Sequence, residues 1–170
     1  MRTLGRGSVP RQVPGQRSPL ARVWAAYPLH PPLTDLTVGA YTTASLLALA
    51  GASGISEPSL AKGWWLALLV GLLASIPTGA SGLAEFLTLG RDDPARPAVI
   101  RHLLAALLTY PLFLAAILLG HAGYRHGTIP AAPLALTLAG FTVLSAAGFL
   151  GGRLVFSRGM RVKRSAGRGR

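Results

Sequence analysis

The sequence predicts an all-α integral membrane protein, an antiparallel bundle of four transmembrane helices with its N- and C-termini in the cytoplasm. Four apolar stretches, each long enough to cross a bilayer as a helix, lie at about 33–55, 63–89, 98–120 and 131–156. Hydrophobic residues make up 51% of the chain and charged residues 13%, whereas a soluble domain carries about a quarter charged residues. All but two of the 17 Lys and Arg residues fall on one side of a four-span arrangement. By the positive-inside rule, that side is cytoplasmic.

The first two stretches are expected to form neighbouring antiparallel helices, because the link between them is short. The first follows a His30-Pro31-Pro32 entry and is the weakest of the four, since several Thr and Ser residues dilute it. It is nevertheless needed, because three spans would place the two basic chain ends on opposite sides of the membrane. In the second stretch, Trp64 and Trp65 occupy positions typical of the membrane–water interface.

The third stretch carries Arg101 and His102 in its opening turns, and the fourth ends in a glycine-rich segment before Arg153. The link at 120–133 is expected to lie outside the membrane, so its His121 and His126 are interpreted as solvated histidines. No internal repeat is evident in the sequence.

The charged ends are interpreted as flanks of a single transmembrane domain at 28–157. Residues 1–27 are predicted to be a disordered basic arm, and residues 158–170 a basic disordered tail. The net charge of +12 is assigned to topology and to anionic lipid head groups. Nucleic acid is not expected as a partner, because no basic surface interleaved with aromatic residues accompanies the charge. The absence of cysteine excludes disulfides and thiolate-ligated metal centres within the chain.

Two sets of small residues predict close helix packing. Gly71, Ser75 and Gly79 recur every fourth residue in the second stretch, and Gly148 and Gly152 form a small-xxx-small pair in the fourth. In lipid, such faces allow close approach of helix backbones.

Ionisable residues near the cytoplasmic boundary are the main functional candidates, since each is costly in lipid and normally faces a partner or a cavity. The antiparallel order places five of them at a similar depth, with every helix contributing. They are His30, Asp35, Glu85, His102 and Arg153. Their agreement in depth follows from the spans, but their rotation about each helix does not.

Three functional readings of this layer stay open beside a purely structural one. His30 and His102 could ligate a haem such as haem b. The same histidines with Asp35 and Glu85 could hold a divalent metal, or the titratable groups could relay protons. In the structural alternative the chain is an assembly protein that packs against partner helices, and Glu85 and Arg153 only neutralise each other. An enzyme acting alone is not expected, because no phosphate-binding loop, catalytic triad or zinc-protease motif is present.

These residues also give the chain a resemblance to the bacterial membrane proteins of domain-of-unknown-function family 2231. The resemblance covers roughly residues 28–162 and rests on four segments: His30 to Leu36 with Gly39-Ala40, Thr78 to Glu85, Arg101-His102, and Gly151 to Phe156 with Gly159 and Val162. It implies that His30, Asp35, Glu85 and His102 occupy positions that the family fills similarly.

The resemblance further implies a bacterial inner (cytoplasmic) membrane location and a link to electron transfer, since some relatives are joined to Rieske-type or cytochrome domains. A membrane or redox protein is therefore a possible partner. Where relatives commonly have Glu or His after the paired glycines, this chain has Arg153. If that position is a ligand in relatives, it is absent here.

Overall fold

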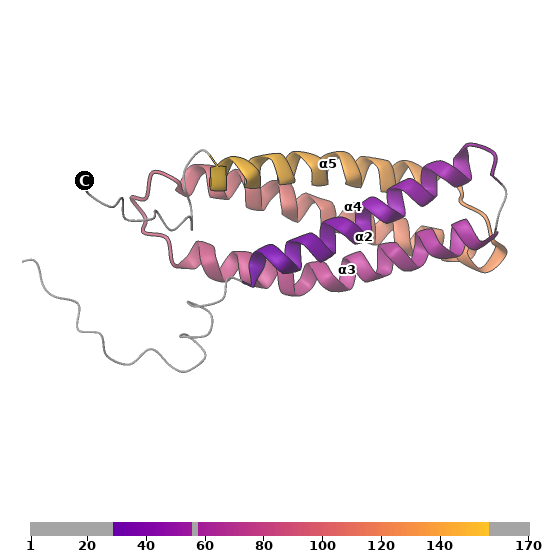
Figure 1. The fold of residues 1–170 in the computed structure, drawn as a ribbon, viewed down its shortest axis with the longest axis horizontal. Helices are drawn as coiled ribbons and strands as arrows, with labels where there is room; N and C mark the ends of the chain where they lie inside the picture. Colours follow the sequence, from indigo (N-terminus) through magenta and orange to yellow (C-terminus); the bar gives the residue numbers. More distant parts are fainter. Residues whose placement is uncertain (1–28, 56–57, 157–170) are drawn as a thin grey trace, which may run out of the picture.

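The computed structural model describes residues 29–55 and 58–156, and within them the chain is entirely helical apart from its links. The helices are α2 (His30–Ala52), α3 (Pro58–Leu87), α4 (Arg96–His126) and α5 (Ala131–Phe156) (Figure 1). Each is long and apolar enough to cross a membrane, which confirms the predicted fold class. The predicted arm at 1–27 and tail at 158–170 lie outside the described residues, and the cytoplasmic orientation stays a prediction.

The four helices form two antiparallel hairpins, α2–α3 and α4–α5, which pack against each other through α3 with α4 and, less extensively, α2 with α5. We call the end where α2 and α4 begin the basic end; it carries Arg91, Arg96, Arg101 and Arg153. Lys62 and Arg125 are at the far end. Figure 1 shows α2 beside α3 at the basic end and closer to α5 at the far end, so α2 and α5 diverge toward the basic end.

The helix bounds differ most from the predicted spans at the start of α3, which is Pro58 rather than 63, and at the end of α4, which is His126 rather than 120. α2 starts at His30, because Pro31 and Pro32 occupy its first turn, where a missing backbone N–H costs nothing. α4 continues to His126 and ends at Gly127, which adopts a left-handed conformation with φ of 70°. The expectation that His121 and His126 lie in an outer link was therefore wrong. The chain stays helical until a residue that tolerates positive φ ends it.

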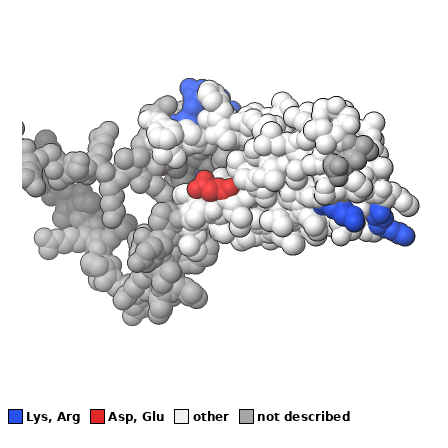
Figure 2. Space-filling view, turned by 45° about the vertical axis from the view of Figure 1, so that its right-hand side comes forward, with Lys and Arg blue, Asp and Glu red and all other residues white. Residues whose placement is uncertain are grey.

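The outer surface of the bundle matches a lipid environment. In the most apolar 18-residue segment of each helix, between 17% and 28% of the residues are buried inside the bundle. Most of each helix therefore faces outward. Large apolar side chains such as Leu46, Leu107 and Leu118 are exposed. In Figure 2 the visible charged side chains lie toward the two ends of the bundle, and the band between them is uncharged.

The centre of the bundle is filled by aromatic rings that reach across its diagonals. Tyr41 of α2 and Phe113 of α4 stack with a centroid separation of 3.7 Å and an interplanar angle of 8°. Trp64 of α3 is fully buried and donates its Nε1–H to Thr137 Oγ1 of α5 at 3.1 Å. These contacts join the two hairpins, and a stacked aromatic pair adds about 0.5–1.5 kcal/mol beyond its buried area.

The two hairpins repeat the same contacts. A Cβ at Gly71 would lie 2.6 Å from the Tyr41 ring, and one at Gly140 would lie 2.8 Å from the Phe113 ring. The pair Tyr41–Gly71 therefore corresponds to Phe113–Gly140, with a shift of 72 residues in the first helix (41 to 113) and 69 in the second (71 to 140). Because α2 and α4 run in the same direction, a pseudo-two-fold axis lies along the bundle, as in parallel repeats of other membrane proteins. The repeat lies in the contacts and was not visible in the sequence.

Candidate functional site

The two candidate ligands His30 and His102 follow the same repeat. His30 precedes Tyr41 by 11 residues in α2, and His102 precedes Phe113 by 11 residues in α4. Eleven residues make about three helical turns and 16 Å, so each histidine lies on the same face of its helix as the aromatic residue. Since Tyr41 and Phe113 meet across the bundle, His30 and His102 are on the facing sides of α2 and α4 near the basic end.

The ring of His102 is oriented by a carbonyl of the neighbouring helix. Its Nδ1 lies 2.9 Å from Ala147 O, and the ring is half-buried. A carbonyl oxygen can only accept, so Nδ1 carries the proton that is donated. In the neutral imidazole, the Nε2 atom then holds the free lone pair, which is the arrangement of a histidine prepared to ligate a metal through Nε2.

His30 has the equivalent arrangement in the other hairpin. Its Nδ1 lies 3.1 Å from Thr78 O and 3.0 Å from Ser81 Oγ. The Ser81 hydroxyl donates its only proton to Thr78 O at 2.7 Å, so toward His30 both oxygens act as acceptors. His30 Nδ1 is therefore the protonated nitrogen and Nε2 holds the lone pair. The bond from His30 to Thr78 O matches the bond from His102 to Ala147 O under the repeat shifts (30 to 102 and 78 to 147).

Two glycines make room for these rings. A Cβ at Gly82 would lie 2.9 Å from His30 Cε1, and one at Gly151 would lie 3.0 Å from His102 Cε1. Both distances are too short for an unshifted side chain, so glycine lets each imidazole lie against the backbone of the second helix of its hairpin. The repeat shift of 69 residues also relates these glycines (82 to 151).

A layer of hydroxyl groups lies on the far-end side of the histidines. Tyr110 of α4 donates its hydroxyl to Ser75 O of α3, and the Thr37 and Thr78 hydroxyls are 2.9 Å apart within the first hairpin. Six contacts join the two hairpins at this layer or between it and the far end: Tyr110–Ser75, Tyr41–Phe113, Trp64–Thr137, Trp65–Ile117, Trp65–His121 and Trp65–Tyr124. At the histidine level, each ring is bonded only to its own hairpin. Sequence reasoning included Thr78 and Ser81 only in a segment that carries the family resemblance, and it assigned no site role to Thr78, Ser81 or Tyr110.

The rest of the predicted polar layer does not join the histidine pair. Asp35 is exposed, since five residues beyond His30 it has turned to another side of α2. Arg153 is also exposed, and its guanidinium lies 6.0 Å from the centre of the Phe149 ring. Glu85 is half-buried. Among the described residues, no group of three or more His, Cys, Asp or Glu side chains could hold a metal ion. The predicted set of two histidines and two carboxylates is therefore not assembled.

Comparison with protein families supports the resemblance seen in the sequence. The model of family DUF2231, described as a predicted membrane protein, matches residues 26–164. The chain belongs to this family. No curated protein and no solved structure matches it.

In this DUF2231 protein the small-residue positions divide into an inner and an outer group. Gly71 and Ser75 are buried, and Gly79 meets the Tyr110 hydroxyl, where a Cβ would lie 2.6 Å from the oxygen. Gly148 is exposed with no atom within 4 Å of its Cβ position. Gly152 is half-buried, with only Phe156 of its own helix nearby. The first set thus receives aromatic side chains inside the bundle, while Gly148 is open.

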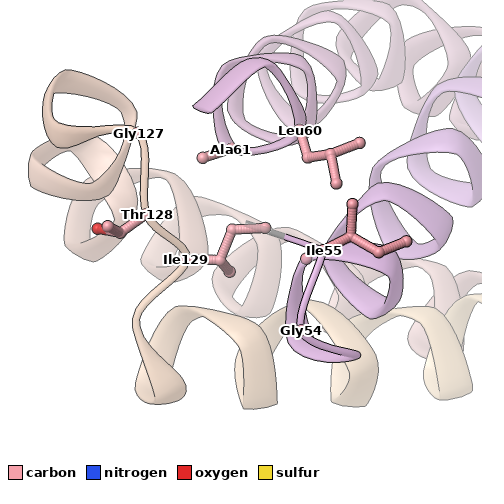
Figure 3. A pocket seen from close by; sticks show the side chains of 8 residues that line it. Gly54, Ile55, Leu60, Ala61, Gly127, Thr128 and Ile129 are labelled. Carbon is pink, nitrogen blue, oxygen red and sulfur yellow. The ribbon is translucent and has the colours of Figure 1, made fainter. Parts of the chain in front are cut away.

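The far end of this DUF2231 protein has different chemistry. Trp65 contacts His121 and Tyr124, with ring centroids 5.5 Å and 4.8 Å away, and its Nε1 donates to Ile117 O at 2.9 Å. A cavity of about 180 Å³ lies between the α2–α3 and α4–α5 links. Figure 3 shows Ile129 projecting from the second link toward the first. The lining residues have no titratable side chain: they are Gly51, Gly54, Ile55, Leu60, Ala61, Gly127, Thr128 and Ile129.

Proposed function

We propose that this protein is a membrane haem-binding module of electron transfer, in which His30 and His102 are the two axial ligands of one haem. The observation that carries the proposal is the matched pair of imidazoles. Each donates Nδ1–H to a backbone carbonyl of its own hairpin. This bond fixes the ring and leaves the Nε2 lone pair free for iron. Among the described residues, neither Nε2 has a hydrogen-bond partner.

The number of ligands favours haem over a bare metal ion. Protein sites for zinc are almost always four-coordinate, whereas the described part offers no group of three candidate side chains. Haem brings four nitrogen ligands of its own and needs only two more from the protein, and facing helices of a bundle supply such pairs. Two histidines are therefore sufficient for haem and insufficient for a zinc-type site.

Each part of this chain has a distinct task in the proposal. Thr78 O and Ala147 O hold the two rings, Gly82 and Gly151 give them room, and the surrounding apolar bundle excludes water. When bound, haem supplies a reversible one-electron change. Arg101, exposed beside His102, adds positive charge for the carboxylates of haem or for anionic lipid head groups.

The location follows the sequence argument. We place the protein in the bacterial inner membrane with the basic end in the cytoplasm, following the positive-inside rule. The histidine pair then lies near the cytoplasmic surface, within reach of a redox protein that docks at the basic end.

Absorption spectroscopy combined with metal analysis tests the proposal. The full chain, produced in haem-replete bacteria and purified in mild detergent, is expected to show a Soret band with close to one iron per chain. His30→Ala and His102→Ala are each expected to lose the bound haem, because hexacoordination needs both rings. His121→Ala and His126→Ala are the matched controls, since both histidines are exposed at the far end of α4.

Three outcomes would contradict or change the haem proposal. A colourless protein without metal, even after reconstitution with haem, overturns the proposal. A metal other than iron that is lost in His30→Ala would replace haem with a metal site. Haem that survives both His30→Ala and His102→Ala would place the ligands elsewhere and also contradict the proposal.

A further inference from the structure

The two-fold repeat fails at one position beside the histidine pair. In the first hairpin, the spaces at Gly79 and Ser75 are filled by Tyr110, whose hydroxyl reaches Ser75 O. The repeat shifts convert Tyr110 to Val38 (110 less 72) and Gly79 to Gly148 (79 plus 69). Valine has no atoms that could reach as far as a tyrosine hydroxyl. No atom lies within 4 Å of the Cβ position of Gly148, so the space equivalent to that of Tyr110 is open.

This open space lies about one turn from Gly151 along α5 and about two turns from His30 along α2. Gly148 precedes Gly151 by three residues, and the His102 ring lies against Gly151. Val38 follows His30 by eight residues, about 12 Å along the helix, and is half-buried. The space therefore lies on the far-end side of the histidines, between α2 and α5. These are the neighbours that pack less extensively than α3 and α4.

The exposed side chains of α5 near Gly148 include the apolar Phe149 and the charged Arg153, whose guanidinium lies 6.0 Å from the centre of the Phe149 ring. Phe149, next to Gly148, is 67% exposed and Val155 is 43% exposed. On the opposite side of the bundle the Tyr110 ring closes the equivalent position. A planar ligand between His30 and His102 thus meets a tyrosine toward α3 and free space toward α5.

We propose that the open space between Val38 and Gly148 receives the apolar edge of the ligand held by His30 and His102, and that the ligand enters there sideways from the bilayer. The inference rests on the proposed function and names the part of the site that decides which ligand shapes fit. Val38 and Gly148 are specificity-determining residues, and Tyr110 directs the ligand toward α5.

Filling the space from either helix tests the inference. Val38→Tyr introduces on α2 the side chain that α4 carries at the equivalent position, and Gly148→Leu fills the same space from α5. The control is Gly39→Leu, because Gly39 is also exposed, also has no atom within 4 Å of its Cβ position and belongs to the outer face of α2. The full-length variants are purified in detergent, and bound haem per chain is measured, together with the uptake of added haemin by apoprotein in lipid nanodiscs.

The expected result is at least a tenfold lower rate of haemin uptake, or a comparable loss of bound haem, in both Val38→Tyr and Gly148→Leu, with Gly39→Leu like the wild type. Helical content and elution volume of the variants report whether each is folded. Unchanged uptake in both filled variants overturns the inference while the proposed function stands. Equal loss in Gly39→Leu also overturns it, since the effect would then not belong to this space.

Two further outcomes are distinguishable. If Gly148→Leu leaves haem content unchanged but converts a dimer of the wild type to a monomer in light scattering, a second copy of the chain occupies the space, which contradicts the inference. A wild type that binds no haem at all overturns the proposed function and this inference together.

Discussion

Replacing Gly71 by Ala is expected to destabilise the bundle, because the space above this glycine is occupied by a ring that cannot retreat. A Cβ at Gly71 would lie 2.6 Å from both Cδ1 and Cε1 of Tyr41 and 3.1 Å from Cγ. Tyr41 is 1% exposed and stacks on Phe113 at 3.7 Å, so the new methyl group must push both rings or separate α2 from α3.

The size of this effect follows from two opposing terms. Overpacking a well-packed core costs about 1–3 kcal/mol, while alanine gains about 1 kcal/mol over glycine in helix propensity. The net loss in the free energy of unfolding is about 0–2 kcal/mol, which lowers the melting temperature by up to about 8 °C for a chain of this size. Gly39→Ala is the matched control. It gains the same propensity with nothing within 4 Å of the new atom, so it is expected to be as stable as the wild type or slightly more stable.

Thermal unfolding of both variants in the same detergent, followed by circular dichroism at the helical band, measures the difference. The same chemical change is thus expected to give a lower melting temperature at Gly71 than at Gly39. A Gly71→Ala variant that melts at or above the temperature of Gly39→Ala would refute the tight packing of Tyr41 against α3.

Three further predictions concern other contacts of the bundle. Thr137→Val removes the acceptor of buried Trp64 Nε1 and is expected to lower stability by about 0.6–1.7 kcal/mol, the range of interhelical hydrogen bonds in membranes. Thr142→Val, whose hydroxyl bonds only within its own helix, should have no such effect in the same melts. At Gly127, φ is 70° and an added Cβ would lie 2.6 Å from Pro58 Cβ, whereas at Gly54 φ is 93° and no atom lies within 4 Å of the added Cβ. The rate of hydrogen exchange at the far end should therefore increase more in Gly127→Ala than in Gly54→Ala. Equal increases would contradict the contact between Gly127 and Pro58. Ser81→Ala removes one of the two acceptors of His30 Nδ1 and leaves Thr78 O. Haem should therefore remain bound to Ser81→Ala but transfer to apomyoglobin several-fold faster than it does from the control Ser145→Ala. Equal transfer rates would show that Ser81 does not hold the ring.

The order of residues along each helix predicts the depth of the candidate site residues in the membrane but not the side of the helix on which they lie. His30 and His102 were singled out because four antiparallel spans place them at one depth, and the structure puts them on facing sides of α2 and α4. The same argument grouped Asp35 and Arg153 with them, but both are exposed. Depth follows from the rise per residue, whereas facing depends on rotation, and a difference of one residue rotates a side chain by about 100°.

Tyr110, Thr78 and Ser81 were missed for a related reason. Their roles depend on which backbone carbonyls and glycines of neighbouring helices lie opposite them, and the sequence does not show that pairing. A search for the shift of 72 and 69 residues would have paired His30 with His102 and Gly82 with Gly151. Such a search needs the pairing of helices within each hairpin, which the structure supplies.

By itself the sequence determined the number of spans, their antiparallel order and the end of the bundle at which positive charge collects. These properties follow from the thickness of the bilayer, the cost of charge within it and the asymmetry of Lys and Arg, all of which are read along one dimension. Only the tertiary structure decided which face of each helix points inward, and therefore which histidines lie on facing sides of α2 and α4. In water an apolar stripe marks the inner face of a helix, but lipid is as apolar as the interior of the bundle. Hydropathy therefore does not distinguish the two faces, and the fit of Tyr41, Phe113 and Trp64 against small residues sets the rotation instead.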